Sequence, residues 1–135
     1  MVVEGIRTQT YSVKMVVKSI VLNKAKQDAL DSMESSISHM AVGSDGTTPT
    51  ESDTALGAET FRETLFSEES SSFIYQAEIF LDSSENNGNT VRETGSFDAS
   101  SGGTMYTRNL TNDIVKDSSV ELFVTLTITF DAQNI

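Results

Sequence analysis

The chain has 135 residues, of which 37% are hydrophobic, and this suits one domain with a core of ordinary size. Twenty acidic against nine basic residues give a formal net charge of -11, so the chain repels nucleic-acid phosphates and anionic lipid. No cysteine is present, which excludes disulfides, thiolate metal sites and cysteine nucleophiles. We expect neither nucleic acid nor membrane as a partner.

Residues 1–22 are predicted to form an N-terminal strand or extended arm. Residues 11–22 read YSVKMVVKSIVL, which is rich in β-branched side chains, and Lys14 and Lys18 would suit an edge strand. No apolar run approaches ~18 residues, so we expect neither a secretory signal nor a membrane span. Residues 23–135 are predicted to form a single β-sandwich domain.

One helix is predicted near residues 24–36, with Asn23 as its N-cap. Apolar residues recur at helical spacing, at Ala25, Ala29, Leu30, Met33 and Ile37.

A strand is predicted from Ile37 to Gly43, followed by a long polar loop that ends at Gly57. The loop contains the only proline, Pro49. Ser52 or Asp53 is predicted to cap a single helical turn within it. We expect the loop to be ordered.

Short strands fill the second half of the chain. They are predicted at Glu59 to Phe66, Ser72 to Leu81, Val91 to Phe97, Thr104 to Leu110 and Val120 to Phe130. Residues 86–89 predict a tight hairpin turn, and the last strand alternates so that one face is buried. The pattern predicts a mainly β fold, an antiparallel β-sandwich of jelly-roll or Greek-key type with one N-terminal helix.

Catalytic and metal-binding groups are scarce. His39 is the single histidine, so no second imidazole or thiolate can join it, and a structural or surface role is expected. Glu68 and Glu69 are interpreted as a solvated charge cluster in a loop. Residues 82–86 space oxygen atoms as a calcium loop does, but the required glycine and glutamate positions do not match, so a hairpin turn is favoured over calcium. We predict no enzyme, no catalytic residue, no metal and no cofactor.

Two segments carry motifs of turn and strand residues. The first is HMAVGSDGTTPTESDTALGAET, residues 39–60, and the second is ETGSFDASSGGTMYTRNLTNDIVKDSSVELFVTLTITF, residues 93–130. Together they resemble a family of small tailed-virus structural proteins, described as tail or tail-fibre-associated virion proteins. The resemblance rests on Gly43, Gly46, Pro49, Asp53, Leu56, Glu93, Gly95, Phe97, Gly102, Gly103, Met105, Arg108 and Lys116. It implies a virion protein without reacting groups.

Several of these motif residues are predicted to shape loops. Gly43 and Gly46 are expected to permit positive φ in the long loop, and the glycines at 102 and 103 are expected to form the turn after the preceding strand. Apolar anchors are predicted to pin loops to the core, at Leu56, Phe97 and Met105.

Arg108 and Lys116 are basic residues in an acidic chain, and they are candidates for pairing with groups such as Glu93, within the chain or between subunits. The interpretation that we favour is a solvated rim pair, which contributes ~0–1 kcal/mol.

These observations support two hypotheses. The first is a virion structural protein that assembles with itself as a symmetric homo-oligomer, and with other virion proteins, on the head, neck or tail, with the arm reaching a neighbour by strand addition. The alternative is a receptor- or carbohydrate-binding module of a viral surface projection, whose partner is a host-surface glycan or receptor. Its loops, residues 47–51 and 86–89, contain no tryptophan or tyrosine, which counts against it.

Overall fold

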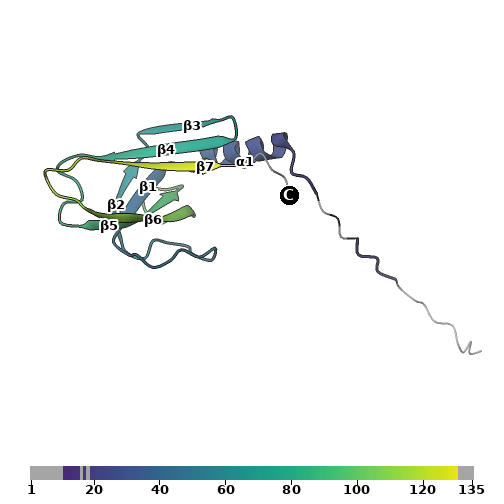
Figure 1. Cartoon of the computed structure of the whole chain (residues 1–135), viewed down its shortest axis with the longest axis horizontal. Helices are drawn as coiled ribbons and strands as arrows, with labels where there is room; N and C mark the ends of the chain where they lie inside the picture. Colours follow the sequence, from purple (N-terminus) through teal and green to yellow (C-terminus); the bar gives the residue numbers. More distant parts are fainter. Residues whose placement is uncertain (1–10, 16, 18, 131–135) are drawn as a thin grey trace, which may run out of the picture.

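The computed structural model describes residues 11–15, 17 and 19–130, and they form one helix and seven strands (Figure 1). The elements are α1 (Asn23–Ser36), β1 (His39–Gly43), β2 (Glu59–Thr64), β3 (Ser67–Ser71), β4 (Ile74–Leu81), β5 (Thr90–Phe97), β6 (Met105–Val115) and β7 (Leu122–Thr129). Residues 1–10, 16 and 18 of the predicted arm, and 131–135 of the predicted domain, lie outside the described residues.

The strands form two antiparallel sheets that lie one above the other (Figure 1). The larger has the order β2-β1-β5-β6 and the smaller has the order β3-β4-β7. The chain changes sheet after β2, β4 and β6, so strands that are distant in sequence, such as β1 and β5, become neighbours. The predicted antiparallel β-sandwich with one N-terminal helix is confirmed.

The core lies between the sheets and includes Met40 and Val42 from β1, Tyr75 and Ile79 from β4, and Leu126 from β7. In β7 the buried and exposed positions alternate, as the sequence predicts. The sandwich therefore buries one face of each sheet.

The predicted cap of α1 is wrong. The N-cap is Leu22, which has no side-chain capping bond, and Asn23 is already inside the helix. The backbone N–H of Lys26 donates to the Leu22 carbonyl at 3.2 Å, so the first turn starts one residue earlier than predicted.

The buried face of α1 differs in part from the predicted stripe. Leu30 and Ile37 enter the core and Met33 packs against it, but Ala25 and Ala29 are exposed. Lys26 takes the inward position one turn before Leu30, so the short alanines are left on the solvent side. The helix contacts β3 and β4. No helix in the described part of the chain is long and apolar enough to cross a membrane.

Three predicted strand boundaries are wrong. The strand predicted to end at Leu110 continues to Val115 as β6. The strand predicted to reach Phe66 ends at Thr64, and β3 then begins in the other sheet, so Glu68 and Glu69 lie in a strand and not in a loop. Ser72 has a φ of 53° and the next residue a φ of 65°, which places a turn where the following strand was expected to start.

The hairpin predicted at residues 86–89 is also wrong, because this turn carries the chain from β4 in one sheet to β5 in the other. The turn between β5 and β6 is a true hairpin connection, as predicted. Its Gly102 and Gly103 have φ values of 60° and 73°, which glycine adopts at little cost.

The single helical turn predicted in the long loop is absent. The loop instead bends at residues 50–53, where the backbone N–H of Asp53 donates to the Thr50 carbonyl at 3.1 Å. The Asp53 carboxylate accepts the Thr50 N–H at 3.0 Å, so Asp53 closes this turn and does not start a helix. Pro49 is half-buried just before it.

Candidate functional site

Glu93 of β5 is the centre of a buried ion-pair cluster, and its side chain is 0% exposed. One carboxylate oxygen, Oε1, accepts hydrogen bonds from Gly57 N at 2.8 Å and Arg108 Nε at 3.0 Å. The other, Oε2, accepts from Asp45 N and Ala58 N, both at 2.9 Å. Glu93 thus fixes both ends of the long loop, residues 44–58, to the four-stranded sheet.

Arg108 of β6 completes the cluster. Its side chain is 5% exposed, and its Nη1 donates to Asp53 Oδ2 at 3.1 Å. Its Nη2 lies 4.0 Å from Asp45 Oδ2 and has no hydrogen-bond acceptor among the described residues. Burial lowers the pKa of Arg108, but the hydrogen bond and charge of Glu93, with those of Asp53, raise it above its ordinary value. The favoured prediction of a solvated rim pair is therefore wrong for Arg108.

The two outer carboxylates of the cluster have lowered pKa values. The pKa of Asp45 is lowered first by the hydroxyl and backbone N–H of Thr47, and then by the charge of Arg108. The pKa of Asp53 is lowered by the backbone N–H and hydroxyl of Thr50, and then by Arg108. With Glu93, three acidic side chains share one guanidinium. We call these four residues the Glu93 cluster.

Gly43 is required by the Glu93 cluster for space and not for its φ. A Cβ at Gly43 would lie 2.5 Å from the Ala58 carbonyl oxygen and 2.6 Å from Glu93 Oε2. A Cβ at Gly46 would come no closer than 3.7 Å, to Arg92 Cδ. Neither glycine has a positive φ, so the predicted conformational role is wrong at both positions.

The predicted apolar anchors do come together. Leu56, Phe97 and Ala41 form a small buried cluster, and Met105 packs against it. Gly95 lies beneath this cluster, where a Cβ would be 2.9 Å from Leu56 Cδ2. The loop is thus held by apolar contacts beside the Glu93 cluster.

Arg62 of β2 holds the hairpin turn between β5 and β6, a role that was not predicted from the sequence. Its guanidinium carbon lies 3.7 Å from the centroid of the Phe97 ring. Its Nη1 donates to the carbonyls of Ala99 and Gly102, both at 2.8 Å. The only sequence signal was a basic residue in an otherwise acidic strand, which does not identify carbonyls some 40 residues away.

Lys116 is also buried, with 0% exposure, but it does not join Glu93. Its Nζ donates to Asn87 Oδ1 at 2.9 Å and to the Asp117 carbonyl at 3.1 Å. The N–H of Gly88 donates to the Lys116 carbonyl at 2.9 Å. Lys116 thus ties the turn after β4 to the end of β6, and the solvated interpretation is wrong here as well.

His39 lies at the start of β1 between two hydroxyl groups. Its Nδ1 is 2.7 Å from Ser38 Oγ and its Nε2 is 3.3 Å from Thr64 Oγ1. Within residues 11–15, 17 and 19–130, no three side chains of the metal-ligating types form a group able to hold an ion.

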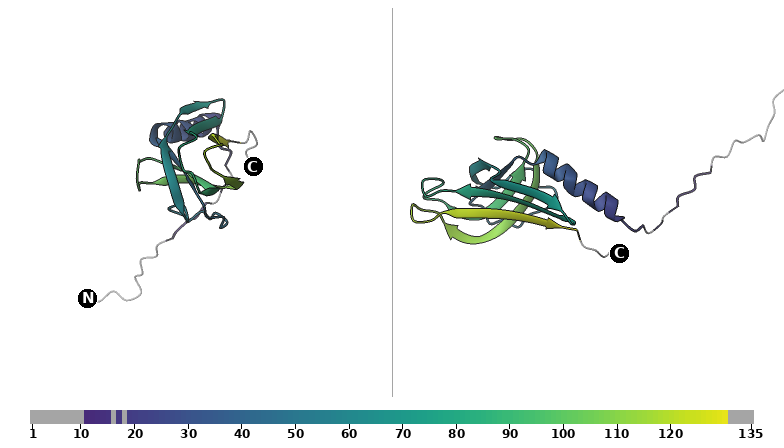
Figure 2. Two further views of the ribbon diagram at one scale, coloured as in Figure 1. Left: turned by 90° about the vertical axis from the view of Figure 1, so that its left-hand side faces the viewer. Right: turned by 90° about the horizontal axis from the view of Figure 1, so that it is seen from above.

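An apolar arm precedes the helix. We define it as the described residues 11–15, 17 and 19–22, and in Figures 1 and 2 it extends away from the sandwich. Its large hydrophobic side chains are 51–90% exposed, at Tyr11, Val13, Met15, Val17, Ile20, Val21 and Leu22. A segment with this many exposed apolar side chains is typical of an interaction site.

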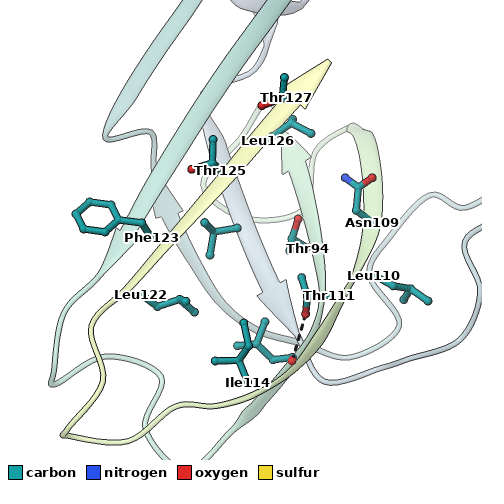
Figure 3. Close-up of a pocket in the computed structure, with 12 residues that line it drawn as sticks. Thr94, Asn109, Leu110, Thr111, Ile114, Leu122, Phe123, Thr125, Leu126 and Thr127 are labelled. Carbon is teal, nitrogen blue, oxygen red and sulfur yellow. Dashed lines mark hydrogen bonds between the residues drawn. The ribbon is translucent and has the colours of Figure 1, made fainter. Parts of the chain in front are cut away.

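A groove of about 340 Å³, the open seam, lies between β6 and β7 (Figure 3). The strands belong to different sheets and share no ladder of hydrogen bonds. Figure 3 shows Ile114, Leu122 and Leu126 in the space between them, whereas Phe123 and Thr125 point away. The sandwich thus has one side where apolar side chains line a gap between two sheet edges.

Three phenylalanines gather on the outer face of the three-stranded sheet. The ring centroids of Phe80 and Phe123 are 4.7 Å apart, and Phe66 lies 5.9 Å from Phe123 and 6.3 Å from Phe80. Phe66 is 65% exposed and Phe123 is 54% exposed. This Phe patch is a second exposed apolar feature, on the opposite face of β7 from the open seam.

In comparisons with known proteins, no protein-family description and no curated protein matches the chain.

Proposed function

We propose that this protein is a structural subunit that assembles with copies of itself, as a building block of a tailed-virus particle. The observation that carries self-assembly is the apolar arm, because side chains such as Val13 at 90% and Met15 at 81% exposure are rarely left in water in such number within one short segment. The virion setting is supported by the resemblance of residues 39–60 and 93–130 to tailed-virus structural proteins. Head, neck and tail positions, with other virion proteins as partners, are all compatible with this role.

The Glu93 cluster supports a structural role for the motif residues. Glu93 accepts hydrogen bonds from three backbone N–H groups and from Arg108, and Arg108 also donates to Asp53, so these side chains hold the loop to the sheet. In the described part of the chain, the Glu93 cluster stabilises the fold, and the apolar arm and the open seam provide surfaces for contact. Assembly by many modest contacts would turn such surfaces into a tight attachment.

The test of self-assembly is the solution mass of the full chain by light scattering, at low and high salt. We expect a discrete oligomer that persists at high salt, because apolar contacts are not screened. The variant Val13→Asp/Val17→Asp should be a monomer. The matched control Ser12→Asp/Ser19→Asp adds the same charge to the same arm without removing apolar side chains, and should remain an oligomer. A monomeric full chain in all conditions would contradict the proposal.

The virion setting has its own test, immunogold labelling of purified intact particles with antiserum against this chain. Labelling at one position on the particle is the expected result. Particles that are not labelled, and in which mass spectrometry finds no peptide of this chain, would contradict the virion setting. This result would leave the proposal of self-assembly unaffected.

One observation favours the alternative, a carbohydrate- or receptor-binding module. Tyr106 of β6, 38% exposed, lines a pocket of about 160 Å³ together with Thr50, Glu51 and Asp53. The fold thereby supplies an aromatic side chain that the loop sequence lacks, and an aromatic face beside polar groups suits a sugar. A glycan array should then give specific binding that Tyr106→Ala abolishes, and an array without hits would remove this alternative.

A further inference from the structure

The four sheet edges of the sandwich differ in how well they are protected against pairing with another strand. β2 (ETFRET) and β3 (SEESS) are short and charged. β6 contains Arg108 and Asp113, and its register with β5 is interrupted twice. Short strands, charges and bulges are the usual means of blocking edge pairing.

The fourth edge, β7, has none of these protections. Its eight residues, LFVTLTIT, include no charge and no proline, and its pairing with β4 runs from Leu122 to Thr129 without a register shift. One side of β7 pairs with β4, and the other side faces the open seam. An uninterrupted, uncharged edge beside an apolar groove is a template for an added strand.

The apolar arm has the complementary pattern. From residue 11 to residue 17 the odd positions, among them Val13, Met15 and Val17, are apolar, whereas the even positions are Ser12, Lys14 and Val16. In an extended strand this spacing makes one face wholly apolar and puts both polar side chains on the other face. Seven residues span ~23 Å and the eight of β7 span ~27 Å, so the lengths agree.

The charges of the two parts also favour contact. Three of the nine basic residues and one of the twenty acidic residues lie within residues 1–22, so this segment has a formal charge of about +2 against about -13 for the remaining chain. A positive arm and a strongly acidic body attract each other between copies, whereas two bodies repel.

We propose, on the basis of the proposed function, that residues 11–17 of a second copy bind in the open seam as an added strand on the edge of β7. The apolar side chains of the arm then enter the groove beside Ile114 and Leu126, and Lys14 lies on the outer face with Thr125 and Thr127. A second copy is the occupant because the arm points away from its own sandwich in Figures 1 and 2. Repetition of this contact links one subunit to the next.

Because the chain contains no cysteine, any disulfide must join the cysteines that are introduced. Lys14→Cys chains carrying a tag are mixed with untagged Thr125→Cys or Thr127→Cys chains and oxidised. Paired strands bring such positions to ~5 Å between Cα atoms, so we expect about tenfold more tagged–untagged disulfide than with a Glu69→Cys control on the charged edge β3.

Three results would overturn the assignment. One is equal cross-linking to Glu69→Cys. Another is a bond that forms only within single chains of Lys14→Cys/Thr125→Cys, which would mean that the arm folds onto its own sandwich. The third is an oligomer by light scattering that gives no Lys14–β7 bond, which would leave self-assembly standing and reject only the seam. A monomeric wild type would instead reject both proposals.

Discussion

The Glu93 cluster and the open seam lie in the same sandwich but differ in their hydrogen bonding. The cluster closes its part of the fold with hydrogen bonds, whereas the seam leaves two strand edges unpaired. At the cluster, a carboxylate with 0% exposure accepts four hydrogen bonds, and the loop of residues 44–58 is closed over the sheet. At the seam, β6 and β7 remain unpaired with each other and apolar side chains line a gap. The charged motif residues maintain the fold, whereas the proposed contacts with a partner use the uncharged edge and the arm.

The largest effect on stability is expected from Glu93→Gln. The amide removes the buried carboxylate charge beside Arg108, which keeps only the half-buried Asp45 and Asp53, and turns an NH₂ group toward N–H donors, so we expect a loss of about 3–5 kcal/mol in the free energy of unfolding. Urea denaturation followed by circular dichroism measures it. The exposed Glu121→Gln is the control and should change stability by less than about 0.5 kcal/mol. Similar values for both variants would mean that the cluster does not close the loop.

A smaller loss is expected from Gly43→Ala. The added methyl group meets the Ala58 carbonyl and Glu93, so the loop or the cluster must shift, at a cost of about 1–3 kcal/mol. Gly46→Ala adds the same atom where there is room, and should stay within about 1 kcal/mol of the wild type. The same denaturation experiment compares the two, and an equal loss would refute the role of close packing at Gly43.

Acidification should weaken the cluster through Asp53. Its folded pKa is below its ordinary value of 3.8, so its contribution is present above that value and is lost as the pH falls through the folded pKa. The difference in stability between wild type and Asp53→Asn should therefore be constant from pH 7 to about pH 5 and shrink toward pH 3. A difference that does not change over this range would show that ionised Asp53 does not support the turn.

The smallest effect on stability is expected in the arm. Val13→Ser/Val17→Ser removes apolar groups that are already exposed, so unfolding at low protein concentration should change by less than about 0.5 kcal/mol. The same variant should lose self-association in light scattering. A large loss of stability in the monomer would contradict this prediction, because it would mean that the arm packs against its own sandwich and stabilises it.

Local patterns in the chain were sufficient for some parts of the fold. The alternation of Leu122, Val124 and Leu126 determined the buried face of β7, and Gly102 and Gly103 determined a turn, because side-chain period and positive φ are properties of a few neighbouring residues. The sequence also determined that the arm is apolar and that the body is acidic.

The remaining features depend on how the strands are arranged in three dimensions. Glu93, Asp45 and Arg108 are far apart in the chain, and whether they form a solvated pair or a buried cluster depends on which strands become neighbours. The failed hairpin at residues 86–89 has the same cause, since a turn sequence does not say whether the next strand joins the same sheet. Sheet membership also left β7 as an unprotected edge, because an edge is a property of the strand order and not of the strand itself.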